Sequence, residues 1–199
     1  MAIAISMLGI WLLAAVQLGF LEAYPNGAPS GACDAMIPVG HSPSVAQTND
    51  SIYDIKLSSA TYCPNKEVTV TIMGKSNGEM FRGFLCQART AVDTYETSGN
   101  LTSGNSNVGT KNECSGKASL THTDRNDKTS AVLKWTPNEG FTSPAFIVCT
   151  IVKEKATFWV KQNVKLTYAG ADNCTTNGAT RTVFVSLILM VVCFVLTHF

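Results

Sequence analysis

Cysteine thiols are the side chains best suited to do chemistry in this sequence of 199 residues, which contains 7 of them. Cys193 lies in an apolar carboxyl-terminal tail, and the others are Cys33, Cys63, Cys86, Cys114, Cys149 and Cys174. Their spacing includes no Cys-x-x-Cys pair and no Cys/His pattern of the structural zinc type, which favours disulfides in an exported chain. The chemistry that the cysteines predict is therefore covalent cross-linking.

One cysteine pair can be predicted from the strands around it. Cys86 and Cys149 each lie in an apolar run that indicates a strand, and we expect them to join the two sheets of a sandwich. The alternative pairs Cys63 with Cys149 and leaves Cys86 as a small buried apolar side chain. A Cα separation above about 7 Å between residues 86 and 149 would exclude the first pairing.

Histidine is the other residue type that could catalyse a reaction or bind a metal, and only His41 and His122 fall between the two apolar ends. A nucleophilic triad would need a Ser or Cys and an acid beside one of them, and Asp124 follows His122 closely. No Gly-x-Ser-x-Gly turn or catalytic cysteine signature is present, so we expect no enzyme activity. A copper or iron site is the alternative, but two histidines about 80 residues apart are more often unrelated, so we expect no metal and no cofactor.

The two ends of the chain predict where the protein resides. Residues 4–21 carry no charge and indicate a secretory signal, with a cut after Ala23, although its amino-terminal part lacks the usual Lys or Arg. Residues 183–199 are apolar, uncharged and barely long enough to span a bilayer. Small polar residues precede them, in the order that a glycosylphosphatidylinositol (GPI) attachment signal requires.

The attachment residue can be argued in two ways. Spacer length favours Asp172 or Asn173, because the distance to the apolar tail is then within the usual range, and Gly170 comes after Asn173. Cysteine pairing favours a later site within residues 177–179, because Cys174 then stays with the domain and the number of cysteines is even. We predict Asn173 on the first argument.

Between these ends lies enough chain for one domain, with nearly equal numbers of acidic and basic residues. Such a balance excludes a strongly basic surface, so we expect no nucleic-acid partner. Sequons at Asn49 and Asn100 predict glycosylation of surface loops. A third sequon starts at Asn173.

The elements that must position these residues are strands. Residues 24–50 hold four prolines and should form an irregular extended segment. Seven β-branched or aromatic runs then predict strands at 52–57, 67–73, 81–91, 118–122, 131–135, 145–152 and 157–166. Residues 94–113 are rich in Ser, Thr, Asn and Gly and predict a flexible excursion. The pattern indicates an all-β, immunoglobulin-like antiparallel β-sandwich whose core contains Phe84, Trp135, Phe146 and Trp159.

The order of several short motifs resembles one known family. In chain order these are Tyr24-Pro25-Asn26-Gly27, Ala32-Cys33, Met36-Ile37-Pro38, Gly40-His41-Ser42-Pro43, Tyr62-Cys63-Pro64, Val68-Thr69-Val70, residues 81–89, Cys114, Leu120-Thr121-His122-Thr123, Trp135-Thr136, Phe146 and residues 158–161. Together they resemble the reeler domain, the amino-terminal domain of reelin. The resemblance extends to the reeler domains of ferric-chelate reductase 1 like proteins and of single-domain invertebrate defence proteins.

The resemblance implies an immunoglobulin-like β-sandwich and a Cys33–Cys114 disulfide. Cys63, Cys86 and Cys149 depart from the family pattern and imply further bridges. The reductase relatives carry DOMON and haem-binding membrane domains after the reeler domain, and here only the apolar tail follows. The reductase activity is therefore not transferable.

These observations predict a signal peptide at 1–23, a reeler domain at 24–168, a polar spacer with the GPI site at 169–182 and a tail at 183–199. The expected function is recognition of an extracellular ligand, such as a microbial surface, a glycan or a protein, in innate defence. The protein would be tethered to the outer face of the plasma membrane through the lipid anchor, or secreted. The alternative is an accessory module for extracellular iron or haem redox chemistry that lacks a catalytic domain of its own, and titration with metal or haem separates the two.

Overall fold

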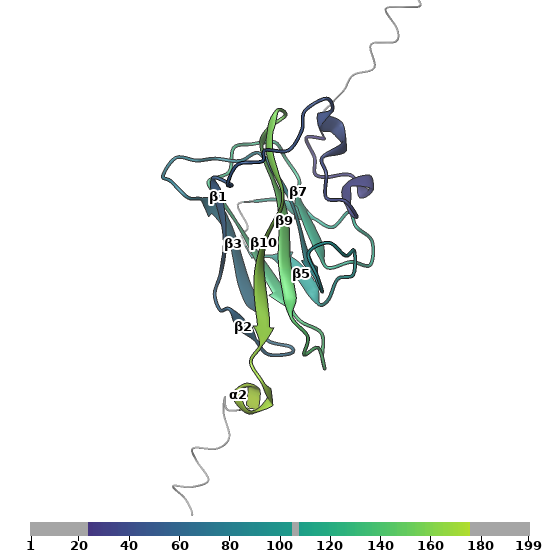
Figure 1. Ribbon diagram of the computed structural model, residues 1–199, viewed down its shortest axis with the longest axis vertical. Coiled ribbons are helices and arrows are strands. Elements are labelled where there is room, and N and C mark those ends of the chain that lie inside the picture. The colour runs from purple at the N-terminus through teal and green to yellow at the C-terminus, as the bar shows by residue number, and fades with distance from the viewer. Residues whose placement is uncertain (1–23, 105–107, 176–199) are drawn as a thin grey trace, which may run out of the picture.

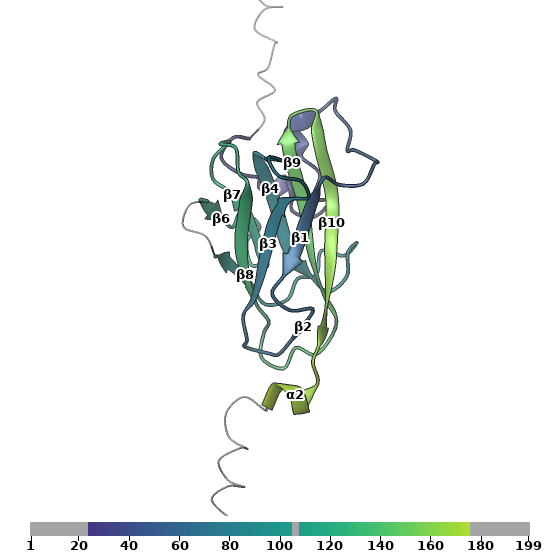
Figure 2. The same ribbon diagram turned by 90° about the vertical axis from the view of Figure 1, so that its left-hand side faces the viewer.

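The computed structural model describes residues 24–104 and 108–175, so the predicted signal peptide, tail and residues 177–179 lie outside the described part. Two sheets pack face to face (Figures 1 and 2). The first has the order β1 (Tyr53–Leu57), β3 (Val68–Gly74), β8 (Ser130–Thr136), β5 (Asn100–Ser103). The second has the order β2 (Thr61–Tyr62), β10 (Thr157–Tyr168), β9 (Ala145–Glu154), β4 (Gly83–Arg89), β7 (Ser119–His122), β6 (Thr110–Lys111). The predicted sandwich is confirmed.

The alternation of apolar and polar residues along its strands explains why the first sheet buries one face. Val68, Val70 and Ile72 of β3 are buried between the sheets, and Leu133 and Trp135 of the neighbouring β8 are buried beside them. The residues between them are only half buried, because they point away from the second sheet. Burial of one face by apolar side chains fixes the register of this sheet.

Strand β4 breaks the alternation because all seven of its residues are buried. Phe84 and Cys86 contribute to the main core between the sheets. Leu85 points to the other face, into a second cluster with Ala32, Cys33, Met36, Cys114 and Val148. The outer face of this sheet is therefore covered by residues 24–41, which we call the N-terminal strap. It contains two short 3-10 turns, η1 (Ser30–Ala32) and η2 (Val39–His41), and is otherwise irregular, as the prolines predict.

Three expectations about local structure are wrong. Residues 94–113, predicted as an excursion, contain β5 and β6 and bury Leu101 and Val108. The sheets are not wholly antiparallel, because β2 pairs with β10 in parallel. Phe146, predicted in the main core, is half buried and packs against the second cluster.

The described residues contain three disulfides, among them the Cys33–Cys114 pair that the reeler resemblance implies and the Cys86–Cys149 pair that the strand pattern predicts. Cys33–Cys114 fastens the strap. Cys86–Cys149 has a Cα separation of 4.1 Å and joins residues that face each other on the neighbouring strands β4 and β9. The expected bridge between sheets is therefore wrong, because both strands belong to one sheet.

The third disulfide joins Cys63 to Cys174. It ties the loop after β2 to the short helix α2 (Ala171–Thr175), which also contains Asn173. The alternative pairing of Cys63 with Cys149 is wrong. In the described part of the chain, no helix has the length and apolar character needed to cross a membrane.

The two sequons predicted to carry glycans have exposed asparagines. Asn49 precedes β1, and its backbone carbonyl accepts a hydrogen bond from the Trp159 indole at 3.2 Å. Asn100 begins the edge strand β5 and does not lie in a loop. Glycosylation at both positions stays a prediction.

Candidate ligand-binding groove

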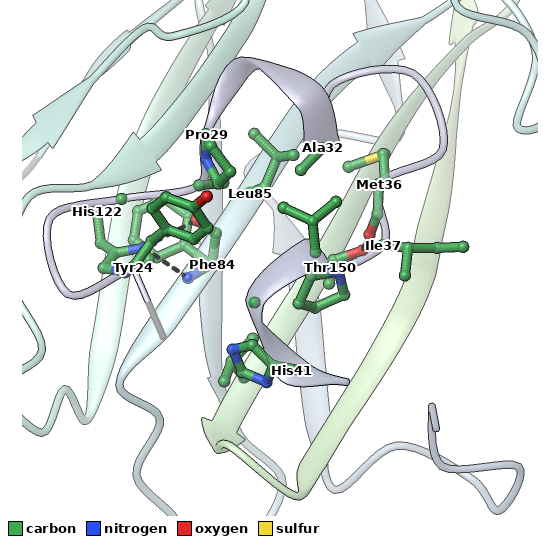
Figure 3. Close-up of a pocket in the computed structure, with 16 residues that line it drawn as sticks. Tyr24, Pro29, Ala32, Met36, Ile37, His41, Phe84, Leu85, His122 and Thr150 are labelled. Atoms are coloured by element: carbon green, nitrogen blue, oxygen red, sulfur yellow. Dashed lines mark hydrogen bonds between the residues drawn. The ribbon is translucent and has the colours of Figure 1, made fainter. Parts of the chain in front are cut away.

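A groove runs between the N-terminal strap and strands β4, β7 and β9 of the second sheet (Figure 3). Its inner part, the apolar pocket, has a volume of about 50 Å³ and lies over Phe84 and Leu85 of β4. The other side chains that line it come from the strap and from β7 and β9; they include Tyr24, Ala28, Pro29, Ala32, Met36, Ile37, Pro38, Val39, His41, His122, Thr150 and Val152. Most of this lining is apolar, so the pocket suits an apolar group.

The outer part of the groove, the charged cleft, has a volume of about 360 Å³. Arg82, Arg125 and Lys155 line it together with one carboxylate, that of Glu154. Arg82 forms an exposed ion pair with Asp127 at 2.9 Å. Arg125 is exposed and forms no ion pair with any residue in 24–104 or 108–175.

Both histidines line the pocket and the cleft, although the sequence favours two unrelated residues. The topology brings them together, because η2 of the strap lies beside the β9–β10 turn and β7 lies next to β4. Nδ1 of His41 donates to the Lys155 carbonyl at 2.8 Å, and its ring packs edge-on against Phe158. Burial lowers the pKa of His41, and the Lys155 charge lowers it further against the effect of this hydrogen bond. His41 is therefore neutral at pH 7.

His122 lies beneath the start of the strap. The Phe84 backbone N–H donates to its Nδ1 at 3.1 Å, and the ring also hydrogen-bonds the Tyr24 backbone. Gly83 lies flat against the ring, since a Cβ at residue 83 would approach it to 2.8 Å. Burial is the main cause that lowers the pKa of His122, and the Lys128 charge adds to it. The hydrogen bonds that the protonated ring donates to the Phe84 carbonyl, 3.1 Å from Nδ1, and to the Tyr24 backbone raise the pKa, as does the charge of Asp124.

Asp124 is not available as a catalytic partner for His122. Its carboxylate forms an ion pair at 3.1 Å with the buried ammonium of Lys128. That ammonium also donates to three backbone carbonyls, those of Arg82, Asp124 and Asn126. Among the residues that the structure describes, no three His, Cys, Asp or Glu side chains gather as metal ligands.

The strap is held over the sheet by two sets of polar contacts. At its start, the Ala28 N–H donates to Thr121 Oγ1 at 2.9 Å, and this hydroxyl donates to the Phe84 carbonyl at 2.6 Å. Gly27 lies so close to the His122 carbonyl that a Cβ would come to 2.5 Å, and its φ is +108°. The groove therefore depends on a glycine at this position.

The second set of contacts is the arginine clasp, formed by Arg89 and Gln87 of β4 beneath η1. Arg89 is fully buried, and its guanidinium donates to the carbonyls of Cys33 at 3.1 Å, Asp34 at 2.7 Å and Val92 at 3.1 Å, and to Gln87 Oε1 at 2.7 Å. Gln87 Nε2 donates to the Cys33 carbonyl at 2.8 Å. The clasp satisfies backbone groups that would otherwise be buried without partners.

We expect the fold to lose stability in acid through His122. Because its pKa in the folded protein lies below the usual value of about 6.5, the unfolded chain binds more protons as the pH falls below that value. The free energy of unfolding should therefore fall between pH 7 and 5, by at most about 1.4 kcal/mol per pH unit for this group. Urea titrations of the wild type and of His122→Gln check this, since the variant should show the smaller slope; equal slopes would contradict the assignment. His41→Gln measures the contribution of the other histidine.

The geometry defines a class of protein: a disulfide-stapled β-sandwich with a strap-covered groove and, in its described residues, no assembled catalytic triad or metal cluster. A family model described as Reeler domain matches residues 31–172. This chain belongs to the reeler domain family.

Two relatives have sequences similar to this chain. A Bombyx mori protein named "Putative defense protein" is 32% identical over 143 residues, covering 70% of this chain and 81% of that protein. Human ferric-chelate reductase 1 is 30% identical over 166 residues, covering 81% of this chain and only 26% of the reductase. The chain thus spans about a quarter of the reductase.

A solved structure supports the fold. The human F-spondin reeler domain superposes with a TM-score of 0.55 at 14% identity, covering 64% of this chain and 95% of that one. At this identity the likeness concerns the fold alone.

Proposed function

We propose that the protein is an extracellular recognition module of innate defence, held on the cell surface by a lipid anchor, and that the groove is its ligand site. The similarity to the Bombyx mori protein supports the defence role, since this chain covers most of that relative. The observation that carries the proposal is the exposed apolar rim of the groove. Tyr24, Ile37 and Val39 line the apolar pocket and are 50–52% exposed. Large apolar side chains that gather in this way around a pocket mark binding sites.

The position of the groove fits this role. Lys155 and Glu154, at the turn between β9 and β10, line the charged cleft, and α2 follows the far end of β10 (Figure 1). A strand of 12 residues spans about 40 Å, so the groove and the predicted attachment segment are at opposite ends of the domain. An anchor after α2 would hold the groove away from the cell's own membrane.

The Cys63–Cys174 disulfide bears on the anchor site. Attachment at Asn173 would remove Cys174 with the tail and leave Cys63 without its partner. A site within residues 177–179 keeps the disulfide, and we prefer it for that reason. Asn173 remains a prediction, and mass spectrometry of the carboxyl-terminal peptide of the mature protein decides between them.

The test uses the full chain expressed on animal cells. A phosphatidylinositol-specific phospholipase should release it, and the released protein should bind bacterial or fungal cells in a pull-down assay. Ile37→Ser removes an exposed apolar side chain from the rim and should weaken binding severalfold, whereas Val45→Ser, which is 77% exposed outside the groove, should not. Equal binding by both variants would exclude the groove. A protein that stays on the membrane and keeps its extreme carboxyl terminus would exclude the lipid anchor.

A second candidate function is an accessory role in extracellular iron or haem chemistry. The observation that favours it is the placement of two neutral imidazoles, those of His41 and His122, in one groove. Neutral imidazole is a good ligand for iron and copper. Titration with ferric ion or haem, followed by absorbance, should show a saturable change that is lost in His41→Gln if this candidate is correct.

A further inference from the structure

We propose that the groove binds an anion that carries a short apolar group, and that the amino terminus created by signal cleavage after Ala23 supplies one of the cations that hold it. The inference rests on the proposed function, in that it requires a secreted chain whose groove is the ligand site. It names the chemical class of the ligand and adds a residue to the site.

The charged cleft favours an anion. Three cationic side chains line it against one carboxylate, and Arg125 has no ion-pair partner in the described chain. Guanidinium groups present paired N–H donors that match carboxylate, sulfate and phosphate oxygens. The two histidines are neutral and add no charge to the cleft.

The mature amino terminus would lie in the same cleft. Tyr24 lines the cleft, and its backbone hydrogen-bonds the His122 ring, which lines it too. Cleavage after Ala23 makes the nitrogen of this residue an α-ammonium group, which is mostly protonated at neutral pH. Removal of the signal peptide therefore adds a positive charge that the precursor lacks at this place.

The volume of the apolar pocket limits the size of the apolar group that the ligand carries. It continues from the cleft, shares Tyr24, His41, His122 and Val152 with it, and holds only about 50 Å³. A volume of this size accepts a few methylene groups and no long chain. One ligand can therefore place its charged end in the cleft and its apolar end against Leu85 and Ile37.

A small amphiphile fits this site better than a protein surface. A protein interface has an apolar core to which large aromatic side chains contribute most. The exposed apolar side chains at the groove are confined to Tyr24, Ile37 and Val39 among the described residues.

Butyl phosphate is the probe, and saturation-transfer NMR on the full chain in phosphatidylcholine nanodiscs is the measurement, with empty nanodiscs as the blank. We expect saturable binding, with butyl glucoside and inorganic phosphate each at least tenfold weaker. Arg125→Ala should weaken butyl phosphate binding about tenfold, because a hydrogen bond to a charged group is lost. Lys66→Ala, an exposed cation beside the Cys63 disulfide at the other end of the domain, should leave it unchanged.

The amino terminus is tested by inserting one residue after Ala23. An inserted Gln cyclises to uncharged pyroglutamate, whereas an inserted Ser keeps an ammonium group, and mass spectrometry verifies both termini. The Gln insertion should bind butyl phosphate at least threefold more weakly than the Ser insertion. Equal binding would overturn the role of the amino terminus, and equal binding of butyl phosphate with butyl glucoside or with inorganic phosphate would overturn the ligand class. Microbial binding that is sensitive to Ile37→Ser would in either case leave the proposed function standing.

Discussion

Replacing Arg89 by methionine should lower the free energy of unfolding by about 3 kcal/mol or more. The substitution fills much of the same space but leaves the carbonyls of Cys33, Asp34 and Val92, together with Gln87 Oε1, without the donors they have now. Each buried polar group without a partner costs about 1–3 kcal/mol, and the four losses are not independent. Urea unfolding measures the change, and hydrogen exchange should rise in residues 28–36 first.

The matched control is Lys56→Met, because this lysine is exposed on β1, which belongs to the sheet that the strap does not cover. It should change stability by less than about 0.5 kcal/mol. A loss below about 1 kcal/mol in Arg89→Met would mean that water or a shifted strap replaces the clasp.

Removing the Cys33–Cys114 disulfide with the double substitution Cys33→Ala and Cys114→Ala should cost about 4.5 kcal/mol. The bridge closes a loop with a sequence separation of 81, and loop closure of this length restricts the unfolded chain by that amount in the entropic account. Urea unfolding of the double variant gives the value. Peptide mapping of the wild type without reductant should recover the two residues in one cross-linked peptide, and a free thiol at either residue would contradict the pairing.

The losses of stability caused by Arg89→Met and by removal of the Cys33–Cys114 disulfide should not be additive. Gln87 Nε2 lies 3.6 Å from Cys114 Sγ and donates to the Cys33 carbonyl, so the clasp and the disulfide hold the same turn of the strap. Once either the clasp or the disulfide is removed, the strap is less ordered, so the remaining one contributes less stability. A combined loss clearly smaller than the sum of the separate losses is the expected sign of this coupling.

The main sandwich could be predicted because its strands alternate. In β3 every second residue, Val68, Val70 and Ile72, is apolar, and the structure buries all three. The pattern gives no such signal for β5 and β6, because Leu101 in β5 and Val108, two residues before β6, are single apolar residues in polar surroundings. These strands form because β7 and β8 offer edges with which a polar backbone can pair.

The groove could not be predicted because it depends on a contact between distant segments. In β4, Leu85 is followed at alternate positions by Gln87 and Arg89, a sequence that usually faces water. Only the strap, brought over that face by Cys33–Cys114, buries them and places His41 near His122. The signal that the sequence offers is the presence of Gln87 and Arg89 in a strand whose other residues are apolar or small.

The Cys63–Cys174 disulfide was missed for a different reason. Counting cysteines favours keeping Cys174 with the domain, where it can pair with another cysteine. Spacer length favours lipid attachment before Cys174, which would remove it. The two rules concern different processes, folding and lipid attachment, and the sequence does not rank them.

The same disulfide determines how the domain carries mechanical load. Tension on the chain beyond Cys174 reaches Cys63 through a covalent bond, so it is shared between the end of β10 and the loop after β2. Because β10 runs lengthwise between β2 and β9, a pull from a particle held at the opposite end acts along the strands and loads their hydrogen bonds together in shear. A sandwich pulled in this direction resists rupture better than one whose terminal strand can be peeled away bond by bond, which would suit the proposed role of binding one surface while anchored to another.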